Sequence, residues 1–214
     1  MTVDAATILV NWLTTNPGHT VSTTLDGAIT ATATTLDVAD GSGFPAATGP
    51  FVVLIGTELL LVTASGNALT LFETNVRYRG AFGTTAAAHA DGVAVHQAVL
   101  YDVSGTSVWT PRAPDGYENT VPGIALQTET AAHVNANTRS GTALIKLHPG
   151  SSSYAESRAM SRLLSERLHN KTGDVEGGGL MEAYELADQP LPQADKLPSG
   201  WVGRLMTFAI TVGG

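Results

Sequence analysis

Hydrophobic residues near the start of the chain recur at the three- and four-residue steps of an amphipathic helix. The pattern covers residues 3 to 15, and Asn-Pro-Gly at 16–18 ends it. A second helix is predicted from Ser153, which forms a capping box with Glu156: the serine oxygen accepts a backbone N–H and the glutamate reaches back to another. We expect the apolar face of the second helix to lie on a sheet; it consists of Ala155, Ala159, Leu163, Leu164 and Leu168.

Between residues 21 and 98 the hydrophobic segments are short, rich in Thr and Val, and separated by turn residues. Segments such as PFVVLIG, ELLLVTA and ALTLFE have the length of strands, and GSGFP and SGN have the composition of turns. This spacing predicts a small all-β module and leaves open whether it is a barrel or a sandwich.

After residue 98 the pattern becomes mixed. A long punctuated loop with one strand is expected up to residue 123, followed by strands at 124–131, 141–150, 179–187 and 204–212. Strand, strand, helix, strand, strand with a leading helix predicts an α+β fold, a two-layer helix-on-sheet sandwich. We therefore expect residues 1–20 and 99–214 to form one domain, with residues 21–98 inserted into it as the all-β module.

The charge of the chain excludes some functions. The net charge is -8, and the first 76 residues hold six acidic side chains and no Lys or Arg. Because tight binding to nucleic acid needs clustered cations, a conventional DNA-binding protein is not expected. The chain has no Cys, so disulfides and thiolate metal sites are excluded, and we expect no cofactor. No apolar run approaches 18 residues, so no membrane-spanning helix is predicted.

The first two cations of the chain, Arg77 and Arg79, lie in the segment RYRG. If this segment is extended, both side chains point to one side and could meet an acidic neighbour, either another subunit or a connector. The favoured interpretation is local: the two arginines neutralise acidic residues of the same module, and Gly80 and Gly83 supply turn conformations. The nearby acids are Asp37, Asp40, Glu58 and Glu73.

His89, Asp91 and His96 could supply metal ligands, but a hydrogen-bonded turn histidine is the favoured interpretation of His89 in a chain without Cys. For catalysis, the sequence has no G-x-S-x-G elbow, no phosphate-binding loop and no H-E-x-x-H motif. Glu182 and Glu185 are three apart on a predicted strand and would face opposite ways, so they are not an acid–base pair. Nothing in the pattern indicates an enzyme.

Two polar loops, at 172–179 and 188–200, are rich in Gly or Pro and lie next to the predicted helix and strands. Such loops on a rigid scaffold commonly contact partners, although each could equally be a solvated connection. The candidate docking residues in these loops are Asp174, Glu176, Asp188, Asp195 and Lys196.

Two segments resemble phage proteins. VPGIALQTETAAHVNANTRSGTALIKLHPGSSSYAESRAMSRLLSERLHN, followed by GGGLMEAYELADQPLPQADKLPSGWVGRLMTFAITV, resembles the tail terminator proteins of long-tailed bacteriophages in the order and spacing of its elements. Residues 34–95 are similar to a small β-module of several phage virion proteins. The shared positions are Phe44, Pro45, Gly56, Glu58, Arg79, Gly80, Gly83, Thr84, His89, Gly92 and Val95.

The resemblance implies a structural virion protein at the head-proximal end of the tail, assembled in the host cytoplasm. Tail terminators form a hexameric ring on the last ring of tail tube protein, stop its polymerisation, and offer the other face to a head–tail connector or stopper protein. DNA passes through such a ring without specific binding, which suits an acidic chain. The alternative is a tail-tip or adaptor component whose β-module binds a host-surface glycan through exposed aromatic residues.

Overall fold

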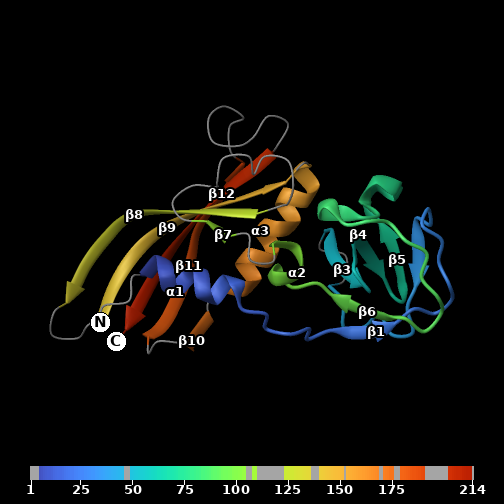
Figure 1. Ribbon diagram of the computed structural model, residues 1–214, viewed down its shortest axis with the longest axis horizontal. Helices are drawn as coiled ribbons and strands as arrows, with labels where there is room; N and C mark the ends of the chain where they lie inside the picture. Colours follow the sequence, from blue (N-terminus) through green and yellow to red (C-terminus); the bar gives the residue numbers. More distant parts are fainter. Residues whose placement is uncertain are drawn as a thin grey trace. The chain divides into compact units, whose positions relative to one another are not determined.

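The computed structural model describes residues 5–45, 49–104, 108–109, 123–135, 140–151, 153–168, 171–175, 179–190 and 202–213. The chain forms two compact units, one from Met1–Asn16 with Ser104–Gly214 and one from Pro17–Val103 (Figure 1). The sequence-based division placed the corresponding boundaries after residues 20 and 98.

Unit 2 (Pro17–Val103) is a small barrel. Its six strands are antiparallel to their neighbours, in the order β1-β6-β3-β4-β5-β2. The first and last strands of this order are joined by a bridge between Leu25 and Val38, with Asp26 N–H donating to the carbonyl of Asp37 at 2.9 Å. The sheet therefore closes on itself, which decides between the barrel and the sandwich. The strands are β1 (Ser22–Thr24), β2 (Thr35–Asp37), β3 (Phe51–Ile55), β4 (Glu58–Ser65), β5 (Ala68–Leu71) and β6 (Ala94–Gln97).

Successive residues of β3 and β4 are buried on both faces of the sheet, as in Val52–Val53 and Leu59–Val62. One face lines the barrel interior, and the 3-10 turns η1 (Phe72–Thr74), η2 (Val76–Tyr78) and η3 (Ala81–Gly83) lie against β4. Gly80, which directly precedes η3, has φ 58°, and a Cβ there would lie 2.5 Å from the carbonyl oxygen of Thr84. The turn therefore requires glycine at this position. A short helix, α2 (Leu100–Ser104), follows β6.

Unit 1 is built on one curled sheet with the strand order β10-β11-β12-β9-β8-β7 (Figure 1). All neighbours are antiparallel except β7 and β8, which are parallel. The register shifts at Thr128/Thr130 and Ala132/Asn135 in β8, and at Glu185/Ala187 in β11. Such bulges bend strands and increase twist, so the sheet curls into a half-barrel. Its strands are β7 (Val108–Trp109), β8 (Gly123–Asn135), β9 (Ser140–Ser151), β10 (Lys171–Val175), β11 (Gly179–Pro190) and β12 (Val202–Gly213).

Two helices accompany this sheet. α1 (Ala5–Thr14) lies against the edge strands β7 and β10, and α3 (Tyr154–Leu168) lies against β9, β11 and β12. At about 100° per residue, the buried positions of α3 span roughly 200° of its circumference, wider than the stripe that a helix on a flat sheet buries. These positions are Glu156, Ser157, Ala159, Met160, Ser161, Leu163, Leu164 and Leu168.

A reciprocal contact joins the carboxyl ends of the two helices. Arg167 Nη2 donates to the carbonyl of Trp12 at 2.8 Å and to that of Thr15 at 3.3 Å, and its guanidinium lies 4.7 Å from the centre of the Trp12 ring. Trp12 Nε1 donates to the carbonyl of Arg167 at 3.4 Å. Burial lowers the pKa of Arg167, but arginine remains charged in proteins. Arg167 thus caps α1 with a cation near the negative end of the helix dipole.

The predicted α+β fold with two layers is wrong: the described structure is mainly β. The helices at 3–15 and from Ser153, and the strands at 124–131, 141–150, 179–187 and 204–212, fall on observed elements. The strands, however, are 12 or 13 residues long and curl. β7 lies in the segment where the sequence predicts one strand within a long loop, whereas β10 is a further strand in a segment predicted to be a loop. A curled sheet with α3 against three of its strands replaces a layer of helices on an open sheet. Sequence periodicity missed this because the bulges have no periodic signature.

Candidate functional site

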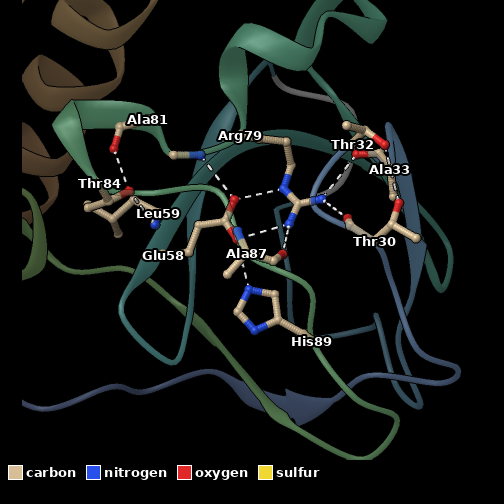
Figure 2. A network of polar contacts seen from close by, with 11 residues as sticks. Thr30, Thr32, Ala33, Glu58, Leu59, Arg79, Ala81, Thr84, Ala87 and His89 are labelled. Carbon is tan, nitrogen blue, oxygen red and sulfur yellow. Dashed lines mark hydrogen bonds and ion pairs between the residues drawn. The ribbon is translucent and has the colours of Figure 1, made fainter.

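The most elaborate polar cluster of the described residues is buried in unit 2, around Glu58 and Arg79 (Figure 2). Glu58 begins β4 and Arg79 follows η2, and the side chain of each is 1% exposed. Arg79 Nε donates to Glu58 Oε1 at 2.7 Å, and Nη2 donates to Oε2 at 2.9 Å. The pair is therefore bidentate, the geometry in which a guanidinium binds a carboxylate most strongly.

All five N–H groups of the Arg79 guanidinium can be assigned to acceptors. Besides the two bonds to Glu58, Nη1 donates to the carbonyls of Thr30 at 2.6 Å and Ala33 at 3.3 Å, and Nη2 donates to the carbonyl of Ala87 at 2.6 Å. The guanidinium thus connects β4 to the segments around residues 30–33 and 87, which lie far apart in the sequence. No donor of this buried cation is left over for a ligand.

The Glu58 carboxylate is also saturated. It accepts hydrogen bonds from the backbone N–H groups of Gly80 at 3.0 Å and Ala87 at 3.1 Å, and from His89 Nε2 at 2.8 Å. Burial raises the pKa of Glu58, but the hydrogen bonds from Arg79, His89, Ala87 and Gly80 together outweigh burial, so its pKa lies below the ordinary value of 4.5. The carboxylate is ionised at neutral pH.

This arrangement is typical of a buried ion pair with a structural role, which holds distant segments of the chain together. A general acid or base needs a lone pair or proton that can reach a substrate, and a raised or near-neutral pKa. Glu58 has neither, because its oxygens are occupied and its pKa is lowered. Thr84 supports the same turn: its hydroxyl accepts the N–H of Leu59 at 3.0 Å and donates to the carbonyl of Ala81 at 2.9 Å (Figure 2).

A second polar cluster lies where the chain enters and leaves unit 2. His19 Nε2 is 2.9 Å from Asp102 Oδ2, and the His19 ring stacks on the His96 ring with centroids 4.5 Å apart. His96 Nδ1 is 2.7 Å from the hydroxyl of Ser22, its neighbour across β1 and β6. Asp102 also accepts the N–H of Val99 at 2.8 Å, which caps the start of α2. The cluster joins the first and last segments of the barrel.

The structure does not bring His89, Asp91 and His96 together. His89 binds Glu58, Asp91 accepts the N–H of Gly27 at 2.8 Å, and His96 contacts Ser22. Within the described part of the chain, no group of three His, Asp or Glu side chains is arranged to hold a metal ion. His89 is hydrogen-bonded, as the favoured interpretation of the sequence had it.

Arg77 and Arg79 do not share a face. Residues Val76–Tyr78 form a 3-10 turn instead of an extended segment, which leaves the Arg77 side chain 58% exposed while Arg79 is buried. Arg77 lies 3.6 Å from Glu73 and 4.6 Å from the centre of the Tyr78 ring. Each arginine therefore has an acidic partner in its own module, and Arg79, being buried, offers no surface contact.

The candidate docking loops are shorter than expected. Asp174 lies on β10 and Asp188 on β11, so both are strand residues. Glu176, Asp195 and Lys196 lie outside the described residues. The contacts of Arg77 and Arg79 agree with the sequence interpretation that both arginines neutralise acids of their own module, but the sequence did not assign Glu58 to Arg79. The residue types indicated that acids and arginines of this module would pair. Which acid pairs with which arginine depends on the three-dimensional path of the chain.

Comparisons with protein-family models, curated proteins and solved structures found no match to this chain. Among the helices of the described residues, none combines the length and the apolar character that crossing a membrane requires.

Proposed function

We propose that this chain is a structural protein of a bacteriophage virion, a tail terminator that forms a ring on the end of the tail tube. In that role it stops polymerisation of the tube protein and joins the tail to the head connector or stopper, and DNA passes through the ring without specific binding. The proposal builds on the resemblance of residues 121–212 to tail terminators and of residues 34–95 to a virion β-module.

The observation that carries ring formation is the curled sheet of unit 1. Its strand order ends at β10 on one side and β7 on the other, and both edge strands are much shorter than the strands beside them. Edges of a sheet expose backbone N–H and C=O groups that favour pairing with another chain. A subunit with two such sides can join identical copies head to tail, and a rotation that closes produces a ring.

The barrel supports a structural role. Its buried charges satisfy one another, so Glu58, Arg79 and His89 hold the module together. The alternative, a glycan-binding module, depends on exposed aromatic residues. Of the five aromatic residues between 21 and 98, only Phe72 is partly exposed, and four are at most 4% exposed: Phe44, Phe51, Tyr78 and Phe82. The barrel thus has little of the surface that would favour glycan binding.

The test is the position of the protein on the particle. Phage particles from cells that produce a labelled copy are imaged by electron microscopy, with unlabelled particles as the control. We expect one ring of label at the junction of tail and head. Label at the tail tip, or none on the particle, contradicts the proposal, and the tip position would favour the adaptor alternative.

A further inference from the structure

On each side of the unit 1 sheet, the short edge strand covers only part of the long strand next to it, and the uncovered part differs between the two sides. β7 pairs with Ile124 and Ala125 of β8, and β10 pairs with Gly179–Ala183 of β11. In the part of the chain that the structure describes, no strand pairs with the outer side of β8 from 126 to 135, or with the outer side of β11 from 184 to 190. Each side of the sheet therefore has a step where a short edge strand stops.

The registers show that these steps lie at opposite ends of the sheet. Ala183, which pairs with Lys171 of β10, is aligned through Ile210 and Ala143 with Ala131 of β8. β10 is therefore level with residues 131–135 of β8, whereas β7 is level with 124–125. The edge strand β7 therefore lies at one end of the sheet on the β8 side, and the edge strand β10 lies at the opposite end on the β11 side.

We infer that copies of this chain join by fitting these two steps together, with β10 of one copy beside residues 131–135 of β8 in the next. This inference rests on the proposed ring and identifies the surfaces that build it. β7 and the neighbour's β10 would then occupy one row of the continuous sheet, end to end, between β8 of one copy and β11 of the other. The partner is a second copy because the two complementary steps belong to the same chain.

Strand direction agrees with this arrangement. Four antiparallel pairings separate β10 from β8 within one copy, so the two strands run in the same direction. Copies related by rotation about a ring axis keep the direction of their strands relative to that axis. The neighbour's β10 would therefore run parallel to β8, as β7 already does. One row would contain strands of one direction, as a regular sheet requires.

The pairing is assigned to unit 1 because the first and last strands of the barrel are already bridged to each other at Leu25 and Val38. The docking hypothesis for Asp174 takes a definite form: this residue lies on β10, the strand that would enter the neighbouring sheet. α1 contacts β7 and β10 and would lie next to the join.

The absence of cysteine from the chain makes cross-linking a direct test. Ala132→Cys is introduced into one full-length copy and Thr172→Cys into a second copy that carries a longer tag, and the two are produced together and oxidised. Ala131→Cys with Lys171→Cys samples the other face, since successive residues of a strand alternate. Because each copy then carries a single Cys, a disulfide that links the two tags can only join two copies.

We expect a disulfide between the two differently tagged copies from at least one residue pair, and none when either single variant is oxidised alone. The double variant Ala132→Cys/Thr172→Cys should give a ladder of covalent oligomers. Arg158→Cys, at an exposed position of α3, replaces Thr172→Cys as the matched control and should give no ladder.

Native mass spectrometry of the unmodified chain separates the two levels of the proposal. A ring without disulfides between the mixed variants overturns the pairing of β10 with β8 but leaves the ring intact. Cross-linking of one variant with itself also overturns it, because a two-fold contact pairs like with like. If the unmodified chain stays monomeric at all concentrations and the mixed cysteine variants form no disulfide between copies, ring formation itself is contradicted.

Discussion

Replacing Glu58 by Gln tests most directly whether the buried network of Glu58 and Arg79 stabilises the barrel. The substitution keeps the size of the side chain but removes the charge that faces Arg79, whose side chain is 1% exposed. One oxygen becomes an NH2 group, so at least one of the donors that Glu58 now accepts is left facing another donor. Removing one partner of a buried ion pair costs about 3–5 kcal/mol, because the remaining charge stays buried.

At about 1.4 kcal/mol per factor of ten, this loss raises the unfolding constant of the barrel by roughly two to nearly four powers of ten. The assay is hydrogen exchange with mass spectrometry on the full chain in increasing urea. Peptides from β3 and β4 report on unit 2, and peptides from α3 report on unit 1. We expect the urea midpoint to fall for the barrel peptides and to stay unchanged for α3.

Two further variants sharpen the result. Arg77→Gln removes a pair whose side chains are each 58% exposed, so it should change the barrel by less than about 1 kcal/mol. Glu58→Met combined with Arg79→Met removes both charges but leaves unpaired the three carbonyls that Arg79 binds and the two backbone N–H groups that Glu58 binds, so it should destabilise the barrel at least as much as Glu58→Gln. If Glu58→Gln shifts the barrel peptides no more than Arg77→Gln does, the network does not hold the fold together and the reasoning is refuted.

Other variants test separate features. Because the pKa of Glu58 is lower in the folded than in the unfolded state, its contribution to the stability of the barrel is fully present above pH 4.5 and is lost as the pH falls through the folded pKa. The urea midpoint of the barrel should therefore decrease in acid, and it should decrease less in Glu58→Gln. An equal decrease with pH in the two proteins would contradict this. Gly80→Ala places a Cβ 2.5 Å from the Thr84 carbonyl at φ 58° and should destabilise the barrel by at least about 1–2 kcal/mol in the same assay, whereas no shift would mean that the turn relaxes freely. Arg167→Met removes the cap of α1 and the contact with the Trp12 ring, and we expect it to lower the stability of unit 1 by about 1–2 kcal/mol. Hydrogen exchange of the α1 peptides should become faster while that of the barrel peptides, the control, stays the same. Unchanged exchange of the α1 peptides would be the contrary result.

The sequence by itself determined the types and places of the main elements. The three- and four-residue spacing placed α1 and α3, and the serine oxygen of Ser153 does accept the N–H of Glu156, at 3.2 Å. The alternation of Met206, Phe208, Ile210 and Val212 placed β12. These features follow from local rules, because capping and pleating depend on residues a few positions apart.

Only the tertiary structure decided which distant residues meet and how the sheets bend. Glu58 and Arg79 are 21 residues apart, and nothing in their spacing distinguishes this pair from Arg79 with Asp37 or Arg77 with Glu58. The 3-10 turn at Val76–Tyr78 separated two arginines that an extended segment would place on one side. The closure of one sheet into a barrel and the curl of the other depend on bulges and on pairings across the whole chain. Such long-range pairings have no local pattern, because they are chosen by the packing of the complete fold.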